Sequence, residues 1–170
     1  MEIAKLTNRE ISSARAVKLL LMDCDGVMTD GRLYFSGRGE ELKVFHVRDG
    51  QGIVTWHRAG FKSGIISGRD AGAVIRKRAD ELGMEFVRVR SADKIKDFQE
   101  IIASAGVTAE ETAFIGDDIG DIELMKTVGF PVAVADAVEE TKAAAAYITN
   151  VAGGHGAVRE VIDLLLRSKS

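Results

Sequence analysis

Five aspartates follow two short apolar segments of this chain. Asp23 and Asp25 come directly after VKLLLM, and Asp117, Asp118 and Asp121 come after TAFIG. Side chains of an extended segment alternate between its two sides, so Asp23 and Asp25 point the same way. If both segments end at one edge of a parallel sheet, their carboxylates repel each other by about 4 kcal/mol per pair at about 4 Å. A cation must offset this repulsion, and oxygen donors without His or Cys favour Mg²⁺ over Zn²⁺.

Each aspartate taken alone could instead cap the helix that follows its strand. For Asp121, a role as a cap or as an acceptor behind the metal ligands stays open beside a direct role. The occurrence of two such groups in one chain favours a shared site.

A hydroxyl and an ammonium lie between the two acidic groups in the sequence. Ser67 stands in IISGR, where its hydroxyl and the backbone N–H groups of Gly68 and Arg69 can hold a phosphoryl oxygen near a helix N-terminus. Lys94 begins a helical segment, and its compact charge can balance carboxylate and phosphate together. Alone, Ser67 could be a helix-entry residue and Lys94 a solvated lysine. Their order along the chain favours a phosphoryl site.

Apolar segments that alternate with amphipathic segments predict the elements that position these groups. Strands are predicted at residues 17–22, 61–67, 84–89, 112–116 and 130–134, and helices at 50–59, 70–82, 94–105, 119–128, 139–145 and 157–166. Helix ends are expected at Gly60, Gly83, Gly106 and Gly129, and N-caps at Asp49, Asp70 and Asp93. Strict alternation favours a parallel sheet covered on both faces, so the expected fold class is a doubly wound α/β domain.

Residues 31–47 break this alternation and predict a β-hairpin around a Ser-Gly-Arg-Gly turn, inserted after the first strand. Apolar residues fall on both of its faces, Leu33 and Phe35 on one and Tyr34 and Phe45 on the other. So short a hairpin cannot cover two faces by itself. A partner subunit is expected to cover one face, with packing on its own domain as the alternative.

The 170 residues, of which 46% are hydrophobic and 29% charged, fit a single domain spanning residues 1–170. The net charge of −3, with mixed signs, gives no field that would concentrate nucleic acid or an anionic membrane. The single cysteine, Cys24, suits a reducing compartment, and neither a signal peptide nor a membrane span is visible. We therefore expect a cytoplasmic protein.

The order DxDGVxT from Asp23, then SGR, then Lys94, then GDDxxD resembles the haloacid dehalogenase superfamily of phosphohydrolases over nearly the whole chain. The resemblance implies that Asp23 is the nucleophile and Asp25 the general acid and base. It also implies that Ser67 and Lys94 bind the phosphoryl group.

The same resemblance implies a Mg²⁺ site between the Asp23 side chain, the Asp25 carbonyl and Asp117. Thr29 would orient Asp25, and Asp118 would be a nearby acidic partner. Cys24, between the two catalytic aspartates, is expected to pack as a small hydrophobic residue.

Members of this superfamily usually carry a cap domain, for which only the hairpin is available here. The chain therefore resembles the capless subclass, and within it the phosphatases of 3-deoxy-D-manno-octulosonate 8-phosphate, a phosphorylated sugar acid of lipopolysaccharide biosynthesis. The matching strings are DCDGVMTDG, FHVRDG, GDD and GGHGAVRE.

This closer resemblance implies a homotetramer in which the hairpins pack together and the C-terminal tail, residues 151–170, reaches a neighbour's site. The glycines of GGHG fit such a tail or a plain loop before the last helix. The substrate carboxylate calls for an arginine, and the candidates are Arg48, Arg69 and Arg78. His155 stands where some relatives carry arginine, so its contact with the substrate stays open.

Three alternatives stand beside this hypothesis. A nonulosonate 9-phosphate phosphatase uses the same chemistry, and Arg69 favours the octulosonate. A phosphoacceptor receiver domain also uses aspartates, a hydroxyl and a lysine, but its lysine comes last, whereas Lys94 precedes Asp117. A catalytically silent assembly module would keep the hairpin but lose the nucleophile, and Asp23 is present.

Overall fold

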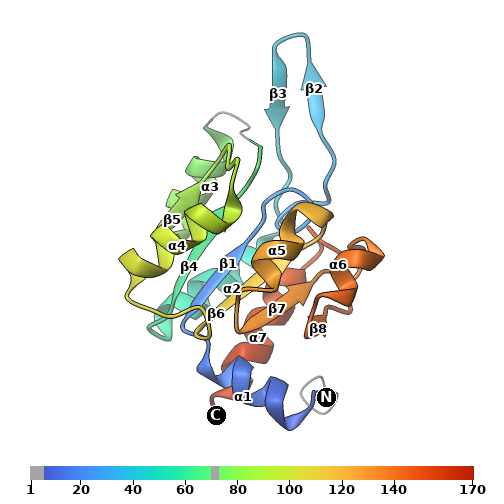
Figure 1. Cartoon of the computed structure of the whole chain (residues 1–170). Coiled ribbons are helices and arrows are strands. Elements are labelled where there is room, and N and C mark those ends of the chain that lie inside the picture. Colours follow the sequence, from blue (N-terminus) through green and yellow to red (C-terminus); the bar gives the residue numbers. More distant parts are fainter. Residues whose placement is uncertain (1–5, 70–72) are drawn as a thin grey trace.

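One parallel sheet in the order β5-β4-β1-β6-β7-β8 forms the centre of the computed structural model, which describes residues 6–69 and 73–170 (Figure 1). Its strands are β1 (Leu19–Met22), β4 (Lys62–Ile66), β5 (Phe86–Arg88), β6 (Thr112–Gly116), β7 (Phe130–Ala133) and β8 (Tyr147–Ile148). Counted along the chain, this is the 3-2-1-4-5-6 order of doubly wound folds. The predicted fold class is confirmed, and β8, a strand of two residues, is an addition to the predicted set.

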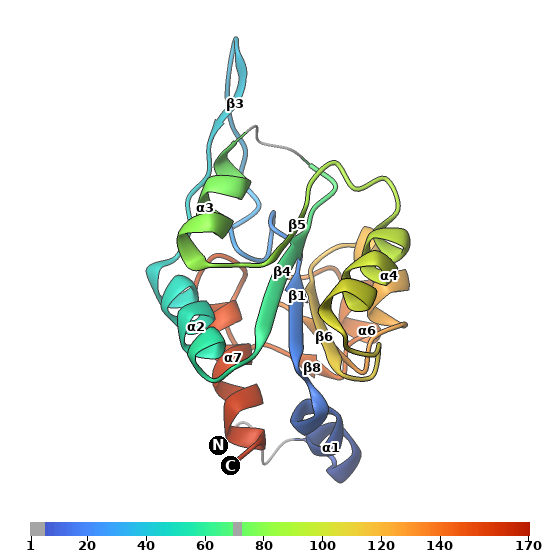
Figure 2. The same ribbon diagram turned by 90° about the vertical axis from the view of Figure 1, so that its left-hand side faces the viewer.

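Helices cover both faces of the sheet (Figure 2). They are α1 (Asn8–Ala16), α2 (Val47–Arg58), α3 (Val74–Leu82), α4 (Lys94–Ala105), α5 (Ile122–Met125), α6 (Glu139–Ala143) and α7 (Ala157–Ser168). On one face lie α2, α3 and α7, while α4 and α6 lie on the other, with α5 packed beside α4. The predicted helix at 119–128 is instead a 3-10 turn, η2 (Ile119–Asp121), followed by the short α5.

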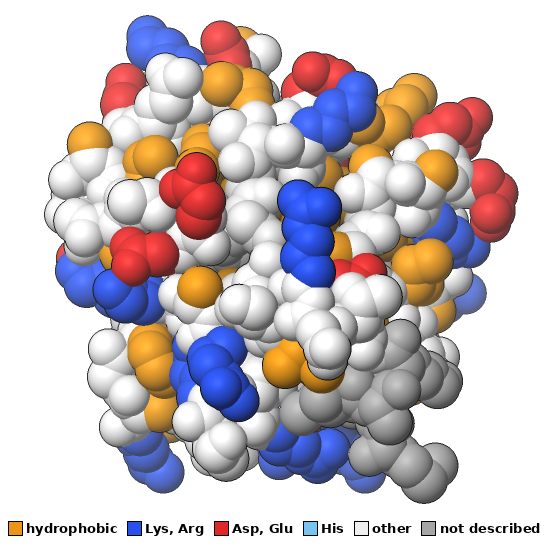
Figure 3. All heavy atoms as spheres, turned by 60° about the horizontal axis from the view of Figure 1, so that its bottom comes forward, with side chains coloured by type: hydrophobic (Ala, Val, Ile, Leu, Met, Phe, Trp, Pro, Cys, Tyr) orange, Lys and Arg blue, Asp and Glu red, His pale blue; other side chains and the backbone are white. Residues whose placement is uncertain are grey.

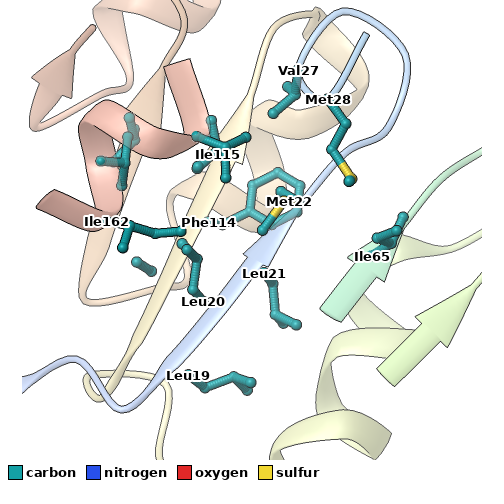
Figure 4. Close-up of a cluster of buried hydrophobic side chains, with 14 of the residues drawn as sticks. Leu19, Leu20, Leu21, Met22, Val27, Met28, Ile65, Phe114, Ile115 and Ile162 are labelled. Atoms are coloured by element: carbon teal, nitrogen blue, oxygen red, sulfur yellow. The ribbon is translucent and has the colours of Figure 1, made fainter. Parts of the chain in front are cut away.

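The central strand β1 explains why the first apolar segment lacks polar alternation. Leu19, Leu20, Leu21 and Met22 are fully buried, because helices lie on both faces and β1 pairs with β4 and β6 at its two edges. Figure 4 shows these side chains beside Phe114 and Ile115 of β6 and Ile65 of β4. Burial of each such side chain stabilises the fold by about 1.5–3 kcal/mol. The core therefore fixes the strand from which Asp23 and Asp25 emerge.

The hairpin, β2 (Tyr34–Ser36) and β3 (Gly39–Leu42), projects away from the body at the end opposite to α1 (Figure 1). The predicted hairpin is confirmed, although α2 already begins at Val47. Its apolar side chains are open to solvent: Phe35 is 66% exposed and Leu42 is 53% exposed. Within one chain, neither face of the hairpin is therefore covered.

Most predicted helix ends are confirmed. Gly83 and Gly106 end α3 and α4 in the left-handed conformation, Gly60 follows α2 with φ +89°, and Asp93 caps α4. Asp70 lies outside the described residues.

Two predicted caps are wrong. Gly129 has no positive φ; it is needed because a Cβ there would lie 2.2 Å from the Glu110 carbonyl oxygen. The N-cap of α2 is His46, not Asp49. Asp49 lies inside α2 and accepts a hydrogen bond at 2.8 Å from the backbone N–H of Arg159, so it caps α7 instead. Asp49 and Arg159 are 110 residues apart in the sequence, so no local sequence pattern predicts this cap.

The surface seen from the α1 end carries charged side chains of both signs, spread among small apolar ones (Figure 3). No helix within residues 6–69 and 73–170 is long and apolar enough to cross a bilayer.

Replacing Gly129 with Ala is expected to lower the free energy of unfolding by about 1–3 kcal/mol, because the new Cβ forces the backbone away from Glu110. Urea unfolding followed by circular dichroism measures the change. Gly37→Ala is the control, since a Cβ at Gly37 meets no atom within 4 Å. Equal stability of the two variants would show that the approach at Gly129 is not tight.

Candidate active site

Three strand ends meet at one edge of the sheet. β4, β1 and β6 are neighbours, and the chain passes from one side of β1 to the other between β5 and β6. In open α/β sheets, ligands bind where the strand order reverses in this way. A cavity of about 320 Å³ lies there, lined by Asp23, Asp25, Gly31, Ser67, Gly68, Arg69, Lys94, Asp117, Asp118, Gly120 and Asp121. The two acidic groups and the phosphoryl-binding candidates Ser67 and Lys94 are therefore together, as predicted.

Lys94 lies between two carboxylates of this cavity. Its Nζ donates to Asp23 Oδ2 at 2.7 Å and to Asp121 Oδ1 at 2.6 Å. As the first residue of α4, it follows the N-cap Asp93, which accepts from the N–H groups of Ile95 and Lys96. Burial lowers the pKa of Lys94, but the two carboxylates outweigh burial and raise it. The ammonium therefore stays charged and balances part of the acidic cluster.

Asp121 organises the turn after β6. Besides binding Lys94, it accepts hydrogen bonds through Oδ2 from the N–H of Asp117 at 3.0 Å and of Asp118 at 3.4 Å. Asp118 caps η2 by accepting from the N–H of Ile119 at 2.8 Å. A Cβ on Gly116 would lie 2.6 Å from that of Asp121, so glycine permits this tight turn. Asp121 thus serves as an acceptor that positions Asp117, one of the roles left open by the sequence.

The acidic cluster has the donor set of a hard divalent cation. Oxygens of Asp23, Asp117 and Asp121 all lie within 4.8 Å of one another. Burial, together with the nearby carboxylates of Asp121 and Asp23, raises the pKa of Asp117 to about 8. Burial also raises the pKa of Asp23 to about 6, although Lys94 opposes the shift. The chain's own cations leave negative charge here uncompensated, and oxygen-only ligands with such charge fit Mg²⁺.

Asp25 faces other partners in the same cavity. Its Oδ1 pairs with Nζ of Lys43, and its Oδ2 lies 3.8 Å from Nε of Arg69. Oδ2 is buried and accepts no hydrogen bond from the part of the chain that the structure describes. A buried carboxyl oxygen that accepts no hydrogen bond is a group that a ligand can complete.

Thr29 closes the segment that follows Asp25, which we call the acidic loop (residues 23–31). The buried Oγ1 of Thr29 accepts from the N–H of Gly26 at 3.4 Å and from that of Gly31 at 3.2 Å. Gly26 and Gly31 have φ of +85° and +75°, which other residues rarely adopt. Thr29 therefore bridges Gly26, which directly follows Asp25, and Gly31. Cys24 is buried, as predicted for a packed residue.

The sequence pattern does not identify Lys43, which the structure adds to the site. Its side chain is 0% exposed although it lies at the base of the exposed hairpin, directly after β3. Lysine is almost never fully buried without a partner, and Asp25 is that partner. The sequence shows at this point only one charged residue between Leu42 and Val44. In a hairpin, such a residue is typically exposed, so the sequence does not predict that Lys43 is part of the site.

Ser67 ends β4 at the cavity. Its N–H donates to the Arg88 carbonyl at 2.9 Å, and its Oγ accepts from the N–H of Arg69 at 3.3 Å. A Cβ on Gly68 would meet no atom closer than 3.8 Å, so this backbone is open to a ligand. Arg69 is half exposed at the rim of the cavity.

Two of the three candidate arginines lie elsewhere. Arg48 lines a separate hollow with His155 and Arg159. Arg78 donates to Glu81 Oε2 at 2.9 Å and lies over the Phe45 ring at 5.6 Å. Neither Arg48 nor Arg78 reaches the acidic cavity of its own chain, which leaves Arg69 as the candidate that does.

The C-terminal segment, residues 151–170, lies against its own chain. Gly153 and Gly154 pack against the acidic loop of their own chain, and α7 after them is a helix with its apolar face buried. The helix predicted at 157–166 is confirmed as α7, and its residues Val161, Ile162 and Leu165 complete the core against α2.

The fold and the cavity define a haloacid dehalogenase-like hydrolase, and the sequence model of that family matches residues 55–162. The 3-deoxy-D-manno-octulosonate 8-phosphate phosphatase KdsC of Yersinia pestis is 43% identical over 156 residues, which are 92% of this chain and 83% of that protein. The chain belongs to the 3-deoxy-D-manno-octulosonate 8-phosphate phosphatase family of these hydrolases.

Solved structures agree with this assignment. The crystal structure of the phosphatase from Yersinia pestis has a TM-score of 0.92 and 41% identity, covering 95% of this chain and 87% of that one. The phosphatase from Moraxella catarrhalis, in complex with magnesium ion, phosphate ion and KDO, has a TM-score of 0.91 and 35% identity, covering 96% of this chain and 93% of that one.

Removing the Asp117 carboxyl is expected to change how stability depends on pH. Its pKa rises from 3.8 to about 8 on folding. The metal-free protein therefore loses stability as the pH rises from about 4 through about 8, because the folded state holds the proton more tightly. In EDTA at about pH 8, Asp117→Asn should be more stable than the unsubstituted chain by roughly 1–2 kcal/mol, and the difference should disappear near pH 4. Urea unfolding across this range measures both values.

The same proteins then receive Mg²⁺ at about pH 8. The unsubstituted chain should gain stability and Asp117→Asn should not, because a ligand that binds only the folded state stabilises it. Asp118→Asn is the matched control, since asparagine still caps η2. A metal-free chain that becomes more stable between about pH 5 and pH 8 as this carboxyl titrates would contradict the raised pKa.

Proposed function

We propose that this chain hydrolyses 3-deoxy-D-manno-octulosonate 8-phosphate to the free sugar acid and phosphate in lipopolysaccharide biosynthesis. The observation that carries the proposal is the cavity in which Asp23, Ser67, Lys94 and Asp117 converge beyond three adjacent strands. Relatives named for this reaction are 43% and 41% identical over 92% of the chain.

Asp23 is the proposed nucleophile. One of its carboxylate oxygens attacks the phosphorus, the phosphorus–oxygen bond to the sugar breaks, and an aspartyl phosphate forms. Asp25 gives its proton to the departing sugar oxygen. As a carboxylate, it then takes a proton from the water that attacks the aspartyl phosphate, which releases phosphate and restores Asp23. The buried Oδ2 of Asp25, which accepts no hydrogen bond within the described residues, supports this role.

The phosphoryl oxygens are held by the Ser67 hydroxyl, the N–H of Gly68 and the Lys94 ammonium. Lys94 already pairs with Asp23, so its charge screens the nucleophile from the phosphate it approaches. Asp118, Asp121 and Thr29 act through other groups, as the hydrogen bonds of their side chains to backbone N–H groups indicate.

Mg²⁺ is the proposed cofactor, held by the side chains of Asp23 and Asp117 and the carbonyl of Asp25. Bound Mg²⁺ supplies the positive charge that lets a dianionic phosphate approach a carboxylate. The raised pKa values of Asp23 and Asp117 support this assignment, because both carboxyls are buried and lie beside other carboxylates, where a bound cation favours their charged form.

The substrate's own carboxylate is the feature that selects among sugar phosphates. Arg69, at the cavity rim, is the proposed partner, since its guanidinium can bind a carboxylate through two parallel hydrogen bonds. Nonulosonate 9-phosphates, of the sialic acid or KDN type, carry the same groups on a longer chain. They are the alternative substrates, and Arg69 favours the octulosonate.

Asp23→Asn is expected to lower Mg²⁺-dependent phosphate release by about 10³-fold or more, because the amide cannot form the aspartyl phosphate. Phosphate release from octulosonate 8-phosphate and nonulosonate 9-phosphate by purified protein measures it. Unfolding curves of the variant show that the fold is intact. Retained turnover would remove Asp23 from the role of nucleophile. No Mg²⁺-dependent release from any ulosonate phosphate by the unsubstituted chain would overturn the proposed function.

The exposed hairpin supports a homo-oligomer, which we infer to be a tetramer. Phe35, Leu42 and Val44 are each more than half exposed, although hydrophobic side chains of this size are ordinarily buried on folding. Lys43, in the same run, binds Asp25, so packing of hairpins against one another would also steady the site.

Phe35→Glu is expected to shift the protein from the assembled form toward the monomer, since a charge then replaces apolar area in the interface. Size-exclusion chromatography with light scattering measures the mass. Ile148→Glu, at an exposed apolar site on β8, is the control and should leave the mass unchanged. A monomeric unsubstituted chain would contradict the oligomer.

We also infer that residues 1–170 act as one domain in the cytoplasm, without nucleic-acid or membrane partners. A continuous core that joins strands and helices supports the single domain. Cys24, the single cysteine, is buried and suits a reducing compartment, and the net charge of −3 gives polyanions little attraction.

A further inference from the structure

The backbone around Gly153 is in contact with the backbone of the acidic loop. The N–H of Gly154 donates to the Val27 carbonyl at 2.9 Å. A Cβ on Gly153 would lie 1.7 Å from the Gly26 carbonyl oxygen, and one on Gly154 would lie 2.4 Å from the Asp30 nitrogen. Gly154 also has φ +68°. The two backbones are therefore in direct contact, and no side chain fits between them.

This segment, Gly153–Gly154, is itself held by the body of the protein. The N–H of Gly153 donates to Asp136 Oδ1 at 2.9 Å, and Thr149 Oγ1 donates to the Val151 carbonyl at 2.6 Å. On its other side, the buried Asp49 of α2 fixes the first turn of α7 through the N–H of Arg159. The segment is therefore anchored at both ends.

The acidic loop depends on such support at Gly26. Gly26 directly follows Asp25, and a Cβ on it would lie 2.0 Å from Asp117 Oδ2. Gly26 is thus confined between the backbone of Gly153 and the side chain of Asp117. Any displacement of Gly26 moves the backbone of Asp25.

We propose that the Gly153–Gly154 segment is a positioning element that sets the place of the Asp25 carboxyl relative to the substrate's leaving oxygen. The inference rests on the proposed function, in which Asp25 protonates that oxygen. Displacement of the general acid should lower kcat/KM most for a substrate whose leaving group needs a proton. An alkoxide leaving from a sugar phosphate needs one, whereas p-nitrophenolate leaves without it.

The test compares kcat/KM for octulosonate 8-phosphate and for p-nitrophenyl phosphate, each at saturating Mg²⁺. The value of kcat/KM includes the transfer to Asp23 and excludes the later attack of water, so it isolates the proton given to the leaving group. Gly153→Ala should lose about 10- to 100-fold on the sugar phosphate. On the aryl phosphate it should lose less than about 3-fold, because that reaction makes little use of the acid.

Gly129→Ala is the matched control, because its Cβ also meets a backbone carbonyl, at 2.2 Å, but at the opposite edge of the sheet. It should leave the ratio of the two kcat/KM values unchanged. Asp136→Ala serves as a milder second variant if Gly153→Ala does not fold. It removes the acceptor of the Gly153 N–H from an exposed side chain, and should shift the ratio in the same direction by a few-fold.

Selective loss on the sugar phosphate in a folded variant supports the inference. Equal losses on both esters, or no loss, overturn it while the proposed function stands. Failure of the unsubstituted chain to hydrolyse the sugar phosphate overturns the proposed function instead, and removes the basis of the inference with it.

Discussion

The repulsion among carboxylates at the carboxyl edge of the sheet is the constraint on which this site depends. Lys94 balances two of them, with its Nζ at 2.7 Å from Asp23 and 2.6 Å from Asp121. Asp117 forms no ion pair with a cation within the described residues, and burial beside two carboxylates raises its pKa to about 8. In a cluster at the surface, the carboxylates would lower their repulsion by turning toward water. Here the strands fix the positions from which the side chains extend. The arrangement is therefore stable near neutral pH when a further cation, or a proton, joins it.

The fold maintains this crowding by bringing backbones unusually close. Gly116 lets Asp121 fold back over the end of β6, Gly26 leaves room for Asp117, and Gly153 lies against Gly26. Each glycine leaves the place of its side chain to a neighbouring group, which is a carboxylate side chain at Gly116 and Gly26 and a backbone carbonyl at Gly153. Because interiors are closely packed, such contacts carry a displacement at one residue to the next. The core thus fixes the positions of the site residues, because all four residues of β1, the strand before Asp23, are buried.

The residues that follow strands could be predicted from the sequence, because a parallel sheet brings its carboxyl ends together whatever the loops do. This is why Asp23, Ser67 and Asp117 meet as expected. The helix at 119–128 and the cap at Asp49 could not be predicted. The side chain of Asp121 turns back on its own strand and shortens that helix, while Asp49 finds its partner in α7. α1 was also unpredicted, since it buries only Ala14 and has little apolar pattern, although Thr7 and Glu10 form a capping box.

Lys43 is a residue of the site that could not be predicted from the sequence. Its distance from Asp25 is set by the path of the hairpin, which projects from the body rather than packing on it. Parts of the chain outside its own motif consequently hold Asp25: Lys43 and Arg69 pair with its carboxylate, and the Gly153–Gly154 backbone supports the acidic loop. A loop with glycines at Gly26 and Gly31 cannot fix a carboxyl by itself, because both residues have few steric limits. A general acid works only within hydrogen-bond reach of its oxygen, so support from both sides is a physical requirement of the proposed chemistry. The missing cap domain makes this support more important, since the chain has little else with which to enclose the reacting groups.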